Sequence, residues 1–259
     1  MKALKAIGKY FKDFGVAFAK GDIWVKLSAV IMGAGYFARK QIINGILITL
    51  VQVGFIVLTM MFSTPALAKF STLGTVQLEQ TFDPLTLQQT TNNYDNSFTI
   101  LLSSVISLFT ILVFVLIYIH NIKAVYGLQK KKEAGEHINT FKEDIKSLFQ
   151  ERFHITLLSL PTIGVIAMNI IPILVLIAVA FTNYDQKHMP PAALFTWVGF
   201  KNFQTLFTSS ITVTFGYAFR KILGWTLLWA VLATATTFLG GILLAKALVS
   251  KTTKLPGMW

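Results

Sequence analysis

Four long apolar runs divide the chain, and polar or charged segments separate them. They cover residues 41–62, 98–119, 157–181 and 222–248. The first has no charged residue in 22 positions, and a helix of that length measures about 33 Å, enough to cross a hydrocarbon core about 30 Å thick. None of the runs alternates polar with apolar residues, which excludes outer-membrane strands. The pattern therefore predicts an all-α fold, a polytopic membrane helix bundle with four transmembrane helices.

An amphipathic pattern precedes these runs. Apolar residues recur at helical spacing and lysines lie largely between them, namely Leu4, Ile7, Phe11, Phe14 and Phe18 against Lys2, Lys5, Lys9, Lys12 and Lys20. This pattern predicts an N-terminal amphipathic helix lying on the membrane lipids of the cytoplasmic leaflet. The alternative is a helix packed on a cytoplasmic partner subunit. A cleavable signal peptide is excluded because it needs a continuous apolar stretch.

The basic residues are distributed unevenly about the predicted membrane. The segments 1–40 and 120–156 and the C-terminal stretch hold 18 of the lysines and arginines, whereas the loops 63–97 and 182–221 hold 5. The positive-inside rule therefore predicts a multi-pass protein of the cell membrane with both termini cytoplasmic. The same distribution accounts for the net charge of +12. Because the charges form no single stripe and accompany no binding motif, nucleic acid is not expected as a partner.

Polar residues inside the predicted spans are candidates for function. Asn44 and Gln52 lie eight residues apart, on one face of the first span, and Asn169 lies in the third. Such amides either hydrogen-bond neighbouring helices, which is the commoner role, or face a water-filled path. Pro172 follows in the third span and predicts a kink, because proline cannot donate to the carbonyl of Met168.

The fourth span carries a stripe of small residues with a spacing of four, namely Ala233, Thr237, Gly241 and Ala245. Small residues let helix backbones approach closely, so the stripe is predicted to pack on another helix rather than to contact substrate. The loop before it is rich in aromatic residues, and Tyr184, Trp197, Phe200 and Asn202 are candidate contacts for an extracellular partner. A short helix lying on the outer leaflet would account for the aromatics equally well.

Catalytic and cofactor-binding patterns are absent from the sequence. The four histidines have no metal-ligand spacing, there are no cysteines, and the phosphate-binding loop of P-loop ATPases does not occur. The acidic residues of 120–156 are interspersed with lysines, as on a solvated helical face. The chain is therefore predicted not to be an enzyme and to hold no cofactor or metal.

Segment 181–207 resembles a stretch of sugar-uptake ABC transporter permeases, where a spanning helix ends in an F-T-N-Y-like sequence followed by W-V-G-x-x-N-F. The matching residues are Phe181, Thr182, Asn183 and Tyr184, then Trp197, Val198, Gly199, Asn202 and Phe203. Residues 21–41 resemble the cytoplasmic leader of maltodextrin-type permeases, and the helix with Trp225, Thr226, Trp229 and the sequence LGGILLA resembles the first helix of the family's transmembrane core. Along essentially its whole length the chain is similar to a MalF/MalC-type subunit.

The resemblance implies four regions: a cytoplasmic amphipathic leader (1–40), three N-terminal transmembrane helices with loops (41–181), an extracellular loop (182–221) and the first helix of the permease core (222–259). It also implies a second permease subunit, ABC ATPase subunits, an extracellular solute-binding protein and an oligosaccharide substrate, with maltose or a maltodextrin expected. Family members continue beyond a sequence like that of 254–259 into further helices and an ATPase-docking loop. We therefore expect a truncated, N-terminal part of a permease, unable to transport by itself.

Two other classes of function remain open from the residues alone. One is a non-transporting membrane protein that anchors or regulates a partner. The other is a membrane enzyme, which is disfavoured because the predicted spans carry no ionisable pair.

Overall fold

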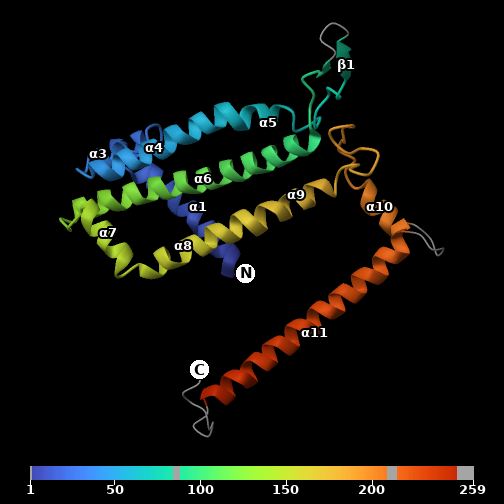
Figure 1. Ribbon diagram of the computed structural model, residues 1–259. Coiled ribbons are helices and arrows are strands. Elements are labelled where there is room, and N and C mark those ends of the chain that lie inside the picture. Colours follow the sequence, from blue (N-terminus) through green and yellow to red (C-terminus); the bar gives the residue numbers. More distant parts are fainter. Residues whose placement is uncertain (1, 84–87, 209–214, 250–259) are drawn as a thin grey trace. The chain divides into compact units, whose positions relative to one another are not determined.

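The computed structural model describes residues 2–83, 88–208 and 215–249, which Figure 1 shows coloured along the sequence. The chain divides into two units, Met1–Trp197 and Val198–Trp259. The last residues of the predicted region 222–259, from 250 onward, lie outside the described residues. In the described part, unit 1 contains α1 (Lys2–Lys20), α2 (Ile23–Leu27), α3 (Ala34–Phe37), α4 (Ile42–Leu58), α5 (Thr64–Ala68), α6 (Ser97–Glu133), α7 (Phe141–Phe149), α8 (Phe153–Val165) and α9 (Ile171–Val179), and unit 2 contains α10 (Lys201–Thr208) and α11 (Phe215–Val249).

Four helical stretches of the described chain are long and apolar enough to cross a membrane, and they confirm the predicted all-α architecture. They are Ile42–Ala68, Ser97–Glu133, Phe153–Val179 and Gly216–Val249. The described residues also include one short antiparallel hairpin of β1 (Gln80–Asp83) and β2 (Gln88–Thr91), which pairs Thr81 with Thr90. The sequence predicted only an exposed loop there, because threonine and glutamine in the segment gave no alternation of apolar and polar residues.

Helix α6 is the centre of unit 1. It packs against α1, α2, α5 and α9, and Figure 1 shows it running between the α4–α5 and α8–α9 stretches. In the most apolar part of α6, 22% of the residues are buried, against 6% in each of the other two spans of the unit. The stacked rings of Phe55 and Phe114, with centroids 3.7 Å apart, join α4 to α6. Most other side chains of the α4–α5 and α8–α9 spans are apolar and exposed, as expected of helices surrounded by lipid.

Two of the spans contain one π-helical turn each, and each turn ends two residues before a proline. The segment η1 (Thr59–Ser63) lies two residues before Pro65, and η2 (Ile166–Ile170) lies two residues before Pro172. Proline has no N–H and its ring clashes with the preceding turn, and a π turn with its wider hydrogen bonds accommodates both effects. The interruption that Pro172 predicts is therefore a π turn, which is one recognised origin of helix bending.

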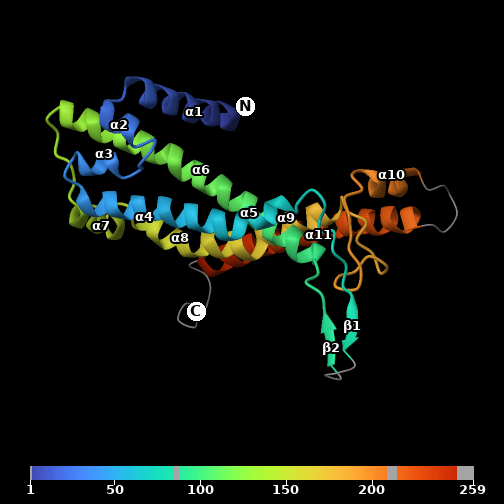
Figure 2. The same cartoon turned by 90° about the horizontal axis from the view of Figure 1, so that it is seen from above.

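The N-terminal helix α1 forms as predicted, and one flank of it packs inside the unit. Ala17 is buried in a cluster with Val25, Ile122 and Val125, and Phe14 packs against this cluster. The Lys123 ammonium lies 3.7 Å from the centroid of the Tyr10 ring. Phe11 and Phe18 lie on a different face of α1 and are exposed. The helix therefore rests on α6, alongside which Figure 2 shows it, and it still presents apolar side chains to its surroundings.

Unit 2 is a helical pair. Helix α10 packs on α11, and the Arg220 guanidinium donates a hydrogen bond of 3.4 Å to the carbonyl of Leu206. Phe200 and Phe203 lie 6.0 Å apart, ring to ring, at the start of α10. The long apolar helix α11 is thus preceded by a short helix that is attached to its first turns.

Candidate functional site

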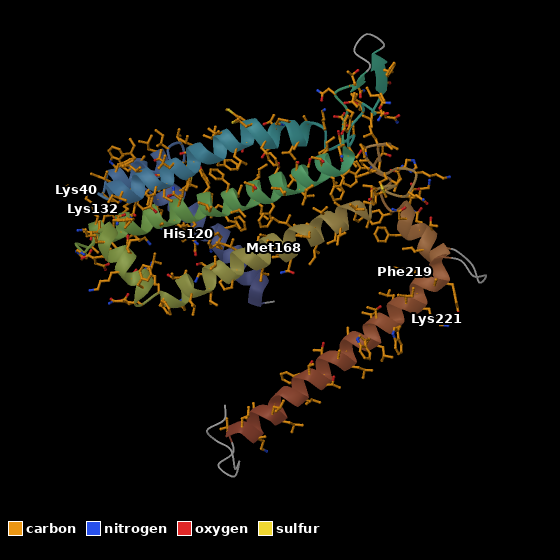
Figure 3. The ribbon with its side chains drawn as sticks, viewed as in Figure 1. Lys40, His120, Lys132, Met168, Phe219 and Lys221 are labelled. Atoms are coloured by element: carbon orange, nitrogen blue, oxygen red, sulfur yellow. The ribbon has the colours of Figure 1, made fainter. Side chains whose placement is uncertain are left out.

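One end of unit 1 gathers its basic side chains, and we call this the basic end. It holds the first turns of α4, the last turns of α6, and α2, α3 and α7. Lys40 and Lys132 lie at this end, whereas Met168 lies midway along its span (Figure 3). The β1–β2 hairpin lies at the opposite end (Figure 2). The basic end is the one for which the charge distribution predicts a cytoplasmic position.

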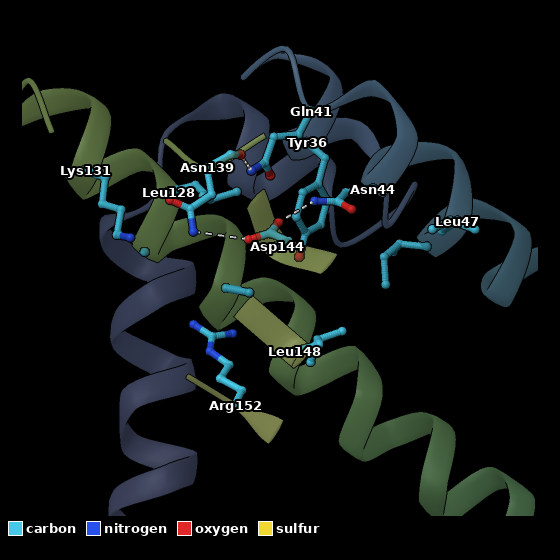
Figure 4. A pocket seen from close by; sticks show the side chains of 13 residues that line it. Tyr36, Gln41, Asn44, Leu47, Leu128, Lys131, Asn139, Asp144, Leu148 and Arg152 are labelled. Atoms are coloured by element: carbon cyan, nitrogen blue, oxygen red, sulfur yellow. Dashed lines mark hydrogen bonds between the residues drawn. The ribbon is translucent and has the colours of Figure 1, made fainter. Parts of the chain in front are cut away.

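A pocket of about 500 Å³ opens at the basic end between α4, α6 and α7. Its wall has two parts, one charged or polar and one apolar. The polar wall consists of Tyr36, Gln41, Asn44, Lys131, Asn139, Asp144 and Arg152, and the apolar wall includes Leu47, Ile48, Ala124, Leu128 and Leu148. Figure 4 shows Lys131 and Arg152 reaching the pocket from different segments of the chain. Both residues are exposed.

The carboxylate of Asp144 organises the polar wall. Its Oδ2 accepts a hydrogen bond of 3.1 Å from Asn44 Nδ2, and its Oδ1 accepts one of 3.3 Å from Asn139 Nδ2. The carbonyl of Asn139 in turn accepts a hydrogen bond of 2.7 Å from Gln41 Nε2. These bonds join α4 to the segment that leads into α7 (Figure 4). Asn44, a predicted intramembrane polar residue, therefore holds the α7 segment in place at the basic end.

Local sequence explains why Asp144 points into the pocket. Helix α7 begins with a capping box, in which Thr140 Oγ1 accepts from the backbone N–H of Glu143 and Glu143 Oε2 accepts from that of Thr140. The cap fixes the first turn of α7, and Asp144 follows directly. Hydrogen bonds from Thr140 and His137 lower the pKa of the exposed Glu143 carboxyl, so the cap is ionised at neutral pH.

Tyr36 contributes a neutral hydroxyl to the same wall. Burial raises the pKa of Tyr36, and the negative charge of Asp144 raises it further. The hydroxyl is therefore protonated at neutral pH and can donate a hydrogen bond. It has no hydrogen-bond partner among the residues that the structure describes.

Side chains of the spanning helices hold the irregular segment 28–33 between α2 and α3. Gln52 Oε1 accepts from the backbone N–H of Met32 at 2.9 Å, and Gln52 Nε2 donates to the carbonyl of Val30 at 2.7 Å. From α6, Tyr118 and Asn121 donate to the carbonyls of Ala29 and Met32, at 3.0 Å each. The predicted polar residue Gln52 thus supplies partners for a backbone N–H and a backbone carbonyl in a stretch of turns, as buried or membrane-embedded backbone groups require.

Three glycines let this leader segment approach the spanning helices closely. An added Cβ at Gly33 would collide with Thr49 Oγ1 and with the carbonyl oxygen of Gly45, and one at Gly45 would lie 2.7 Å from the ring of Phe37. A Cβ at Gly35 would collide with Val125 of α6. The sequence-based search for small residues selected only the last span and missed these positions. Their signal is weak, because the contacts join glycines that are far apart in the sequence.

A buried arginine joins the two ends of the leader segment 22–39 through an ion pair. Arg39 Nη2 lies 3.1 Å from Asp22 Oδ2, and Arg39 Nη1 donates to the carbonyl of Gly35. The side chain of Arg39 is only 2% exposed. The backbone N–H of Asp22 donates to Gln129 Oε1 at 2.9 Å, which fastens the leader to the last turns of α6.

At the opposite end of unit 1, the aromatic loop packs on the helix ends. Trp197 Nε1 donates to the carbonyl of Phe70 at 2.8 Å, and the two rings lie 5.2 Å apart. Phe195 is fully buried, and the exposed ring of Tyr184 packs edge-on against it at 5.3 Å. The predicted partner contacts Tyr184 and Trp197 are therefore held on a rigid base.

Asp95 fixes the neighbouring segment. Its carboxylate accepts from the Lys69 ammonium at 2.5 Å and from the backbone N–H groups of Thr75 and Val76. The hydrogen bond from Lys69 is the main reason that the pKa of Asp95 is lowered, and the backbone donors lower it further. An ionised Asp95 thus fastens the chain that leaves α5.

The remaining predicted site residues are not brought together. Phe200 and Asn202 belong to unit 2, so the structure gives no arrangement of them with Tyr184 and Trp197. Asn169 lies in the π turn η2, exposed and without a side-chain hydrogen bond among the described residues. In unit 2, the stripe Ala233, Thr237, Gly241 and Ala245 lies along α11, where Thr237 Oγ1 donates to the carbonyl of Ala233. Among the described residues, no group of histidine, aspartate or glutamate side chains could hold a metal ion.

Comparison with known proteins finds relatives of one kind. The chain is 30% identical over 220 residues to the maltodextrin transport system permease protein MalC of Streptococcus pneumoniae, and 31% identical to the corresponding protein MdxF of Bacillus subtilis. It is 29% identical to the galactooligosaccharides transport system permease protein GanP of Bacillus subtilis. Each match covers 85% of this chain but only 46–48% of the relative. No family model matches the chain, and no solved structure matches it.

The matches span most of this chain and about half the length of the curated relatives. Those relatives are transport permeases and not enzymes, in agreement with the sequence-based prediction for this chain. The four apolar helices and the relatives together make it a multi-pass membrane protein. We conclude that, over most of its own length, the chain is a homologue of sugar-transport permeases of the MalC type.

Proposed function

We propose that the chain forms part of the membrane-spanning permease of an ABC importer for oligosaccharides. The observation that carries this proposal is the 220-residue similarity to permeases of sugar transport systems, which covers 85% of this chain. The four apolar helices supply the membrane-spanning part that such a permease requires. In this role the chain contributes to the translocation path and performs no chemistry on the sugar.

The finer specificity that we propose is for maltodextrins. Two of the three named relatives are maltodextrin permeases, and the third is a galactooligosaccharide permease. Both substrates are short chains of hexoses, so the shared class is a neutral oligosaccharide. Maltodextrin is favoured because the relatives named for it have slightly higher identity, 30–31% against 29%.

The partners follow from this role. We propose a second permease subunit, two ATPase subunits on the cytoplasmic side and an extracellular solute-binding protein. Transport would proceed by alternating access, in which closure of the ATPases reorients the helices about a site near the middle of the membrane. The aromatic surface with Tyr184 and Trp197 suits contact with the binding protein, because the Trp197 side chain is bonded to the carbonyl of Phe70 and the Tyr184 ring packs on Phe195.

A gene deletion in the organism that carries this chain tests the proposal. Uptake of radiolabelled maltotriose should be lost, and should return when the complete gene is supplied on a plasmid. Uptake of a labelled galactooligosaccharide, measured in the same strains, decides between the two substrate classes. Unchanged uptake of both sugars in the deletion strain would contradict transport and favour the alternative, a membrane protein that anchors or regulates a partner.

A further inference from the structure

We propose that the pocket at the basic end of unit 1 binds the phosphate headgroup of an anionic glycerophospholipid. Its ligand would be a structural lipid of the leaflet at the basic end. The proposal depends on the chain being embedded in a membrane, and it does not depend on transport.

The charges of the pocket favour an anion. Lys131 and Arg152 line it, and neither forms an ion pair within the part of the chain that the structure describes. The one carboxylate in the lining, Asp144, has both oxygens occupied by the amide donors of Asn44 and Asn139. The lining therefore offers two cationic side chains to a ligand, whereas its single carboxylate is already engaged by amide donors. A phosphate group takes charge-assisted hydrogen bonds from such a pair of side chains.

Neutral donors complete the polar wall. The hydroxyl of Tyr36 is protonated and has no partner among the described residues. It lies on the same wall as the Asn44–Asp144 pair (Figure 4). A phosphodiester carries one negative charge and has four oxygens that can accept hydrogen bonds. Two cationic side chains and one hydroxyl donor are therefore enough to bind it.

The apolar wall points to a lipid rather than to a soluble phosphate compound. Leu47 and Ile48 lie five and six residues inside the start of α4, which places them about 8–9 Å deeper than Ile42 along the helix. Leu128 and Leu148 face the same cavity. Polar groups at the helix ends and apolar groups one to two turns deeper match the headgroup and the upper acyl chains of a lipid. Basic pockets of this kind between spanning helices are recognised lipid sites.

The test uses the chain purified in non-ionic detergent and freed of lipid. Phosphatidylglycerol is added stepwise, and native mass spectrometry measures the fraction of protein that carries one lipid. Phosphatidylethanolamine is titrated in parallel, and sodium phosphate and glycerol 3-phosphate form a third arm. We expect saturable binding of phosphatidylglycerol, weaker binding of phosphatidylethanolamine, and no competition from either soluble phosphate at the same concentration.

Charge-removing variants locate the site. Arg152→Gln and Lys131→Gln each remove one charge-assisted hydrogen bond and should weaken phosphatidylglycerol binding about tenfold. Lys142→Gln is the matched control, because Lys142 is an exposed lysine of α7 outside the lining and should bind as the parent does. All three residues are exposed, and unchanged circular dichroism and gel-filtration profiles establish that the variants fold.

Three outcomes would overturn the proposal. Equal loss in Lys142→Gln would mean that lipid binding follows total charge and not the pocket. Equal binding of phosphatidylethanolamine would remove the preference for an anionic lipid. Full competition by glycerol 3-phosphate would identify a soluble phosphate compound as the ligand.

Discussion

The amide of Gln52 satisfies one donor and one acceptor of a backbone segment that has no helix of its own. In a membrane, these groups have no water to replace a lost partner. Gln52→Leu should therefore lower the free energy of unfolding by about 1–3 kcal/mol. Unfolding by SDS titration of the detergent-solubilised chain, followed by circular dichroism, measures this change.

Asn169→Leu is the control for Gln52→Leu. Asn169 is also an amide in a predicted span, but it is exposed and has no side-chain partner among the described residues. Its replacement should leave stability unchanged. Equal effects of the two substitutions would show that the hydrogen bonds of Gln52 contribute nothing to stability.

The carboxylate of Asp95 makes the loop after α5 sensitive to acid. Its pKa is lowered below the ordinary value of 3.8, chiefly by the Lys69 ammonium, so the folded state favours the ionised form. The stabilisation is complete above about pH 4–5 and is lost as the pH falls through the folded pKa. Thermal unfolding of the parent and of Asp95→Asn should differ at pH 7 and converge toward pH 3. Glu79→Gln, at an exposed position nearby, should follow the parent at every pH.

At the residue scale, the sequence identified polar side chains but not what they contact. Asn44 and Gln52 stood out because they share a helical face within an apolar run. Their partners, Asp144 and the backbone of residues 30–32, lie elsewhere in the sequence and become neighbours only through the tertiary fold. Asp144 in particular resembled one more charge on a solvated helix. The spacing of residues shows which polar side chains share a helical face, but it does not show which distant residues they contact.

The α4 helix contains two glycines, of which Gly45 is packed against Gly33 of the leader and Gly54 has open space where a Cβ would lie. Gly33→Ala would bring its Cβ onto the backbone of Gly45, which cannot move aside easily, so it should lower the free energy of unfolding by about 1–3 kcal/mol. At Gly54→Ala nothing lies within 4 Å of the new Cβ, and alanine should raise helix stability by about 0.5–1 kcal/mol. Chemical denaturation of both variants should show shifts of opposite sign, and shifts of the same sign would refute the close crossing.

The small-residue stripe of α11 remains a prediction. If Gly241 meets another helix in the assembled permease, Gly241→Leu should cost about 1–3 kcal/mol through over-packing. Ile242→Leu, one position further round the helix, should be nearly silent. Co-purification with the partner subunits and thermostability in detergent measure both variants. Equal behaviour of the two would mean that the stripe faces lipid.

At the element scale, the four spans could be predicted because a lipid environment requires long, uninterrupted apolar helices. The β1–β2 hairpin could not, since its Gln- and Thr-rich strands lie at the surface and bury no regular face. The π turns η1 and η2 could not be predicted either. A proline predicts that a helix is interrupted, but whether the interruption is a π turn depends on how the flanking turns pack.

For the whole molecule, the distribution of basic residues predicts the orientation. Reporter fusions after residues 20, 80, 135 and 195 should give inside, outside, inside and outside signals in turn. The basic end, with its pocket, would then face the cytoplasm, and the Trp197 surface would face outward. An outside signal at residue 135 would reverse this assignment.

The hydrogen bonds between the leader and α6 can form only after α6 has been synthesised. Tyr118 and Asn121 each bond to residues that precede them by 89 positions. A ribosome that adds about 5–20 residues per second needs roughly 4–18 s to cover that distance. For that interval the turn between α2 and α3 exists without its partners on α6. The leader therefore reaches its final conformation only after the second span has been synthesised.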